Sequence, residues 1–214
     1  LDAVLEAARE LPGQGWQNRL SAFQPLGAGE TFFMHLRAAI YNSVADPESL
    51  YDLQTSLHPA SEPVQAAAQP FAEALAAIVE PLKRLASALK TVLDDNADTI
   101  DTAGRGRLEG AIRGIELRAS GPLNAWQLML SDITGGARDG FVDWIQIDRR
   151  DGQDRDVGMA RHWLDPTIPF AHSVLEKAHG TVITSATLQD NAVAKSSSTA
   201  SQTTPIDGWQ SAIK

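Results

Sequence analysis

Over most of the first 135 positions, apolar residues recur every three or four residues, the spacing that places them on one face of an α-helix. The longest such pattern follows Ser61-Glu62-Pro63, which is typical of a helix start because serine can cap the first turn and proline fits within it. The apolar stripe continues past Pro81, so we expect one long kinked helix here and not two. Long helices joined by short turns form an antiparallel bundle, so the pattern predicts a mainly α fold.

Shorter helices are expected on both sides of the long one, bounded by glycine and proline pairs. The expected helices cover residues 1–11, 29–45, 102–118 and 123–133, with Gly121-Pro122 as an interruption between the last two. The segment 48–60 is expected to be a connection. Because the first helical pattern is already under way at Leu1, we expect the native chain to extend upstream.

After Gly140 the apolar spacing changes to alternation, which is typical of strands. Residues 141–147 and 157–164 predict a β-hairpin, with the charged segment 148–156 as a long tip. Arg149 and the other two arginines of this tip are interleaved with aspartates, so we expect a solvated turn that does not contact phosphate.

The hairpin is followed by signals for one more helix and one more strand. Residues 171–178 are amphipathic, and the β-branched run 181–184 is typical of a short buried strand. The expected fold class is therefore an antiparallel helical bundle followed by a small α/β portion with a β-hairpin and one buried strand.

Two hydroxyl side chains, Ser185 and Thr187, come directly after this strand, in the sequence Ser-Ala-Thr-Leu. Open α/β sheets bind ligands at the carboxyl ends of their strands. The strand with this tetrapeptide resembles motif III of superfamily 2 helicases. With the preceding sequence DPTIPF and its helix, it resembles the DinG/XPD-like branch of ATP-dependent DNA helicases, over residues 161–188.

This resemblance implies an organisation in three parts. Residues 1–138 would form the helical, arch-like insertion that helps enclose a single DNA strand. Residues 139–188 would be the end of the first motor domain, and residues 189–214 a polar loop and the start of the second. Ser185 and Thr187 would couple the ATP site to the DNA-bound state through hydroxyl hydrogen bonds.

The parent protein would use ATP and Mg²⁺ to move along single-stranded DNA with 5′ to 3′ polarity, in DNA repair or replication, and a cytoplasmic location fits best. ATPases of this class hold the phosphates with a Gly-Lys-Ser/Thr loop, but none of the five lysines follows a glycine. No Asp-Glu pair is present for the metal-holding acidic box. We therefore expect an internal fragment that binds no cofactor and is inactive by itself. Because the chain has no cysteine, it cannot supply ligands to an iron–sulfur cluster.

Four arginines form a local excess of positive charge and are the candidate DNA contacts: Arg105, Arg107, Arg113 and Arg118. Arg107 and Arg118 are eleven residues apart, which would place them on one face of an α-helix, along a phosphate backbone. The alternative is a solvated helix face with ordinary ion pairs such as Arg105–Glu109. The net charge of −9 argues mildly against DNA binding, although phosphate contacts depend on local potential.

Other residues give weaker signals. The histidines lack the spacing of metal ligands, and the tryptophans are more typical of a core. Trp144 and Trp163 are expected either to face each other across the hairpin or to pack under the helix that precedes Ser185. No apolar run is long enough for a transmembrane helix, so we expect no membrane partner. The rival hypothesis is a non-enzymatic helical protein-interaction module, which the acidic, alanine-rich helices fit equally well.

Overall fold

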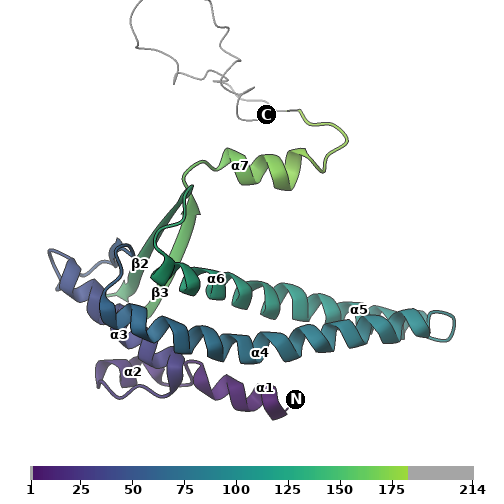
Figure 1. Cartoon of the computed structure of the whole chain (residues 1–214), viewed down its shortest axis with the longest axis horizontal. Coiled ribbons are helices and arrows are strands. Elements are labelled where there is room, and N and C mark those ends of the chain that lie inside the picture. Colours follow the sequence, from purple (N-terminus) through teal and green to yellow (C-terminus); the bar gives the residue numbers. More distant parts are fainter. Residues whose placement is uncertain (1, 183–214) are drawn as a thin grey trace, which may run out of the picture. The chain divides into compact units, whose positions relative to one another are not determined.

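The computed structural model describes residues 2–182 (Figure 1). The chain separates into two units, residues 1–162 and residues 163–214, which are described one at a time. The first unit is mainly helical and contains a small antiparallel sheet, so the predicted mainly α class with a β-hairpin is confirmed.

The chain begins with short helices that lead into a longer, buried one. They are α1 (Asp2–Ala7), the 3₁₀ turn η1 (Ala8–Glu10), α2 (Trp16–Ser21) and α3 (Gly27–Ser43). The helices expected over 1–11 and 29–45 are present, whereas α2 was not predicted because six residues give too short an apolar pattern. Phe32, Leu36 and Ile40 of α3 are completely buried.

Glu30 of α3 is a buried acid that fixes this amino-terminal region. Its carboxylate forms an ion pair with Arg19 of α2 and accepts hydrogen bonds from the backbone N–H groups of Gly13 (3.2 Å) and Leu26 (2.9 Å). The hydrogen bonds from Arg19 lower the pKa of Glu30 to about 2, and the backbone bonds act in the same direction. One carboxylate thus connects α2 and the loops on either side of it to α3.

The long helix α4 (Glu62–Asp95) runs without interruption through Pro70 and Pro81, which confirms that the apolar stripe belongs to one helix. Ser61 is its N-cap residue, but the serine hydroxyl makes no capping hydrogen bond. Each proline removes one backbone hydrogen bond. Burial of the apolar face against α1, α3 and α6 offsets that loss.

The break expected at Gly121-Pro122 was wrong, because the chain stays helical from α5 (Thr102–Gly114) through η2 (Ile115–Ser120) into α6 (Gly121–Gly135). The segment η2 is a π-helix, in which the N–H of Gly121 bonds to the carbonyl of Glu116, five residues back. In an ordinary α-helix, the ring of Pro122 would crowd a backbone carbonyl of the preceding turn. The wider π-helical turn gives the carbonyls there different hydrogen-bond partners. A β-carbon at Gly121 would lie 3.1 Å from the Glu116 carbonyl oxygen, so glycine fits this turn best.

The sheet has the order β1-β2-β3, with β1 (Leu53–Ser56), β2 (Phe141–Arg150) and β3 (Gln153–Trp163). β1 lies in the segment expected to be a connection, and its Leu53 pairs with Ile147 of β2. The prediction of a long hairpin tip over residues 148–156 was also wrong. β2 and β3 are joined by Asp151-Gly152 alone, and both residues have positive φ (54° and 74°). Asp-Gly is a strong signal for this tight type of turn. The ring of His162 lies against Trp144, with centroids 4.6 Å apart.

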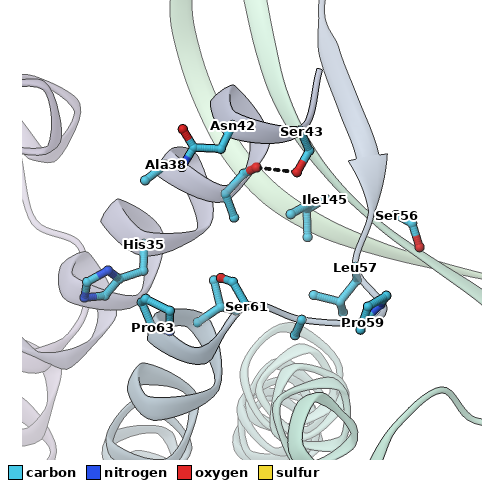
Figure 2. A pocket seen from close by; sticks show the side chains of 13 residues that line it. His35, Ala38, Asn42, Ser43, Ser56, Leu57, Pro59, Ser61, Pro63 and Ile145 are labelled. Carbon is cyan, nitrogen blue, oxygen red and sulfur yellow. Dashed lines mark hydrogen bonds between the residues drawn. The ribbon is translucent and has the colours of Figure 1, made fainter. Parts of the chain in front are cut away.

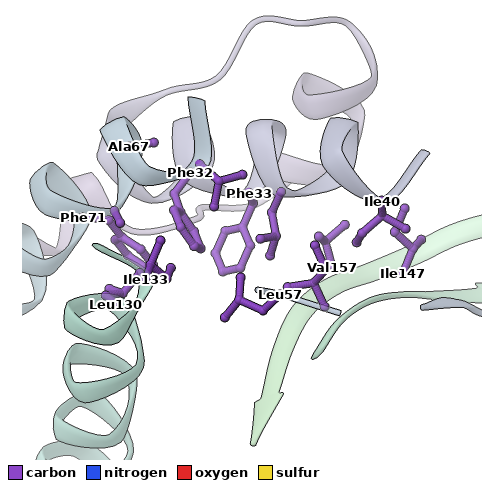
Figure 3. Packing of buried hydrophobic residues seen from close by; sticks show 14 of the residues in the cluster. Phe32, Phe33, Ile40, Leu57, Ala67, Phe71, Leu130, Ile133, Ile147 and Val157 are labelled. Carbon is purple, nitrogen blue, oxygen red and sulfur yellow. The ribbon is translucent and has the colours of Figure 1, made fainter. Parts of the chain in front are cut away.

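One hydrophobic core joins the helices of the first unit to the sheet (Figure 3). Phe32 and Phe33 of α3 lie between Phe71 of α4 and the sheet, where Ile147 and Val157 are buried. Leu130 and Ile133 bring the end of α6 into the same cluster. The helices α2, α3, α4 and α6 and all three strands contribute buried residues to it.

The second unit contains α7 (Thr167–Phe170) followed by the π-helical η3 (Ala171–Leu175), where the amphipathic helix was expected. Asp165 starts it by accepting hydrogen bonds from the backbone N–H (2.9 Å) and hydroxyl (2.6 Å) of Thr167. Thr181 and Val182 lie outside any strand, and the rest of the strand expected over 181–184 is outside the described residues. No helix within residues 2–182 has the length and apolar character needed to cross a membrane.

Phe23 carries a backbone conformation that favours glycine. Its φ is 56°, it follows the end of α2, and its side chain is 71% exposed. The bonds from Phe23 N to the Leu20 carbonyl and from Gln24 N to the Arg19 carbonyl form a Schellman cap, in which this position is usually glycine.

Phe23→Gly should therefore raise the free energy of unfolding by about 1 kcal/mol, measured by urea denaturation. Phe23→Ala is the matched control because it removes the ring but keeps the β-carbon and its strain. Equal stabilisation by both variants would show that the phenyl ring, and not the backbone, carries the cost.

Candidate nucleic-acid interface

The predicted DNA-contacting arginines lie on an antiparallel helical hairpin, made by α4 and the continuous helix α5–η2–α6 (Figure 1). At the turn between its arms, Asp101 caps α5 by accepting a hydrogen bond from the N–H of Gly104 at 2.9 Å. A β-carbon at Gly104 would lie 2.6 Å from the Asp101 carboxylate, so a larger residue here would have to displace the capping side chain. Across the arms, Lys90 of α4 pairs with Glu116 of η2 at 2.6 Å.

Arg105 holds the turn of this helical hairpin. Its side chain is half-buried, and its guanidinium donates to the backbone carbonyl of Ala97 at 3.1 Å. This bond ties the first turn of α5 to the segment after α4. Of the four arginines predicted from the sequence, Arg105 is thus the one with a structural contact across the turn.

The other three, Arg107, Arg113 and Arg118, are exposed. Arg107 donates to the carbonyl of Ala103 within its own helix at 3.3 Å. Glu116, the acid nearest to Arg113 and Arg118 in sequence, is engaged by Lys90 on the other arm. Their positive charges therefore face solvent, as phosphate contacts require. We call these three exposed arginines the arginine stem.

The π-helix η2 changes how the arginine stem is arranged along its helix. The eleven-residue spacing of Arg107 and Arg118 predicts a shared face only if every turn is α-helical. Arg118 lies within η2, where hydrogen bonds reach five residues back and each turn holds more residues. The angle about the helix axis between Arg107 and Arg118 therefore differs from the angle that eleven residues of regular α-helix would give.

The tip of the helical hairpin has the opposite charge. Asp94, Asp95, Asp98 and Asp101 cluster where the arms join. A nucleic-acid strand would be repelled from this end and attracted to the arginine stem. Ser185 and Thr187, the other predicted site residues, lie outside the described residues.

Arg161 of β3 anchors the base of the helical hairpin to the sheet. It binds both oxygens of Asp143 on β2, each at 2.6 Å, and one oxygen of Asp132 on α6 at 2.7 Å. Arg138 also binds Asp132 at 3.0 Å, and His58 contacts Asp143 at 3.2 Å. We call these five residues the Arg161 network.

The charges of this network stabilise one another. Hydrogen bonds from Arg161 keep the pKa of Asp143 below its usual value against the opposing effect of burial, and His58 adds to them. For Asp132, burial acts to raise the pKa, but the hydrogen bonds from Arg138 and Arg161 outweigh it and the pKa is lowered. Sequence reasoning missed this network. The available signal was Asp143, an acid at an inward position of the alternating strand that also carries Ile145 and Ile147.

The expectation that Arg149 is solvated was wrong. Its side chain is only 5% exposed, and it donates to Asp154 (2.9 Å) and to the carbonyls of Pro47 (2.8 Å) and Ser49 (2.6 Å). Arg37 of α3 binds the same aspartate at 2.8 Å. The tight turn at Asp151-Gly152 places Arg149 inside the paired strands and not in a loop, so its charge is used within the fold.

A separate cavity of about 340 Å³ lies between α3, the segment after β1 and the start of α4 (Figure 2). His35, Asn42 and Ser61 are among its polar lining residues, and no acid, lysine or arginine of the described residues lines it. The hydroxyl of Ser43 donates to the Ala39 carbonyl at 2.8 Å. The lining thus lacks the acidic partner that a serine–histidine catalytic arrangement uses.

Asp143→Ala should lower the free energy of unfolding by about 2 kcal/mol, because it removes both charge-assisted hydrogen bonds between Asp143 and the mostly buried Arg161 and leaves Asp132 as the partner of that guanidinium. Urea denaturation at pH 7 measures this loss. Asp139→Ala, an exposed aspartate just before β2, is the control and should change stability by less than about 0.5 kcal/mol.

Asp143→Ala should also change how the free energy of unfolding depends on pH. Because the pKa of Asp143 is lowered in the folded state, the unfolded state binds more protons and stability falls on acidification below about pH 4. The stability of Asp143→Ala should depend less on pH in this range. A parallel acid dependence in both proteins would contradict the assigned role of Asp143.

Replacing the arginine stem by Arg107→Gln, Arg113→Gln and Arg118→Gln together should weaken binding of oligo(dT), measured by fluorescence anisotropy. Each lost phosphate contact on a single strand reduces the slope of log K against log salt by about 0.7, so the expected reduction is about 2. Arg9→Gln, Arg150→Gln and Arg155→Gln together remove the same charge from exposed positions elsewhere. Equal weakening by both triple variants would show a general charge effect and no local interface.

Comparison of this chain with protein-family models, with curated proteins and with solved structures finds no match.

Proposed function

We propose that this chain is part of an ATP-dependent DNA helicase and contributes a helical insertion that helps to enclose single-stranded DNA. The observation that carries this proposal is where the helical hairpin is inserted. β1 ends at Ser56 and its partner β2 begins at Phe141, so α4, α5, η2 and α6 all lie between two neighbouring strands of one sheet. An insertion anchored at both ends can project over a bound strand while its base stays fixed.

The base of this insertion is held by specific contacts. β1 pairs with β2 from Leu53↔Ile147 to Ser56↔Trp144, which fixes the outgoing end. Arg161 binds Asp132 near the end of α6 and Asp143 of β2, which fixes the returning end. The arginine stem then presents its charges on a supported helix, which suits backbone contact with a strand of any sequence.

The rest of the helicase reaction is assigned through the sequence resemblance. Ser185 and Thr187 would couple the nucleotide site to the DNA-bound state. ATP and Mg²⁺ would be held by other parts of the enzyme, because the chain has no Gly-Lys-Ser/Thr sequence. Within residues 2–182, no group of histidine and acidic side chains converges in a way that could hold a metal ion. Single-stranded DNA is the proposed partner, with repair or replication in the cytoplasm as the setting.

A second candidate function, a protein-interaction module without enzymatic activity, is favoured by apolar side chains on the same helical hairpin. Leu85 and Val92, seven residues apart on one face of α4, are 46% and 45% exposed, and Leu117 of η2 is 68% exposed. Such a surface would bind a protein in a manner that depends little on salt. Binding of oligo(dT) that weakens steeply with salt would favour the helicase assignment instead.

The proposal is tested on the protein encoded by the complete gene. Ser185→Ala with Thr187→Ala should leave ATP hydrolysis stimulated by single-stranded DNA but reduce duplex unwinding by about tenfold, the effect of losing a typical coupling free energy between two sites. Ser196→Ala with Thr199→Ala, in the nearby polar segment, is the matched control and should unwind normally. A protein that neither hydrolyses ATP in the presence of single-stranded DNA nor unwinds duplexes would contradict the proposal.

A further inference from the structure

A second cavity, of about 470 Å³, is lined by four aromatic side chains, and the residues of the arginine stem are not among the described residues that line it. Trp16, Phe33, Phe71 and Trp126 contribute its rings, and residues of β2 and β3 complete its wall. We call it the aromatic cavity. Its volume lies within the range of pockets that bind small organic molecules.

The rings of the aromatic cavity form a connected, well-supported surface. Ring centroids are 5.5 Å apart for Trp16–Phe33, 5.6 Å for Phe33–Trp126 and 6.1 Å for Phe71–Trp126. Phe33 and Phe71 belong to the buried core (Figure 3), which holds them in place, whereas Trp16 and Trp126 are half-buried. Aromatic faces carry negative electrostatic potential, so such a surface attracts cations as well as apolar groups.

The charged residues that line the cavity are both acidic. Asp148 of β2 accepts a hydrogen bond from Gln146 at 2.8 Å through one oxygen, and Asp156 of β3 accepts one from the Val157 N–H at 2.9 Å through one oxygen. Within the described part of the chain, the second oxygen of each carboxylate accepts no hydrogen bond and could accept one from a ligand. Among residues 2–182, no lysine, arginine or histidine lines the cavity, so its charge favours a cation and disfavours phosphate.

We propose that the aromatic cavity binds a small organic cation with an apolar body, such as an arylalkyl guanidinium. The apolar body lies against Trp16 and Trp126, and the cation donates hydrogen bonds to Asp148 and Asp156. A guanidinium matches this pairing because it stacks on aromatic rings and binds carboxylates through a planar set of donors. This site does not depend on the proposed helicase function, since the residues that would hold the cation are not those proposed to contact DNA.

Isothermal titration calorimetry with phenethylguanidinium on the whole chain tests the proposal. N-phenethylurea is the neutral probe of the same shape, and 3-phenylpropionate is the anionic one. At low salt the guanidinium should bind about tenfold more tightly than the urea, because only the cation gains the carboxylate and aromatic contacts. Tryptophan fluorescence should change with the same saturation curve.

Asp148→Asn with Asp156→Asn should remove most of this preference for the cation. Asp139→Asn with Asp151→Asn makes the same charge change at exposed aspartates outside the cavity and should preserve it. If the first double variant fails to fold, Asp156→Asn alone, at an exposed position, should still weaken guanidinium binding.

Three outcomes would overturn the proposal. These are a lack of saturable guanidinium binding, equal affinity for the urea or the anion, and a cation affinity that the Asp148 and Asp156 variants leave unchanged.

Discussion

The contact on which the architecture most depends is the ion pair between Arg161 and Asp143, because it lies where the helical hairpin meets the sheet. Asp132, at the end of α6, shares the same guanidinium, and His58, just before α4, shares the same carboxylate. Both ends of an 84-residue excursion between paired strands are thereby joined at one buried site. If this site is lost, the hydrophobic core still connects the elements, but the base of the helical hairpin is no longer fixed in one geometry.

How far the fold could be predicted depended on how local each signal was. The helix α4 was predictable because its apolar stripe continues through Pro81, and buried contacts then outweigh the cost of the proline. The strand β1 was not, since Leu53–Ser56 carries one fully buried residue and becomes a strand by pairing with residues about ninety positions later. The π-helix η2 was missed because Gly121-Pro122 is a general breaker signal, whereas the wider turn that accommodates it depends on packing against α4.

The same distinction applies to the candidate sites. Exposure of Arg107, Arg113 and Arg118 could be expected from their charge, while the contact of Arg105 with Ala97 depends on how the turn closes. The Arg161 network and the burial of Arg149 combine residues from distant segments, so sequence spacing alone could not reveal them. The roles of Ser185 and Thr187 stay predictions from the family resemblance.

The most direct test of the central claim, that the arginine stem contacts single-stranded DNA, is NMR observation of arginine Nε–Hε signals while oligo(dT) is added. We predict that the signals of Arg107, Arg113 and Arg118 shift and return at high salt, while those of the buried Arg149 and Arg161 stay unchanged. Unchanged signals from all three stem arginines, at oligonucleotide concentrations that saturate binding, would contradict the account.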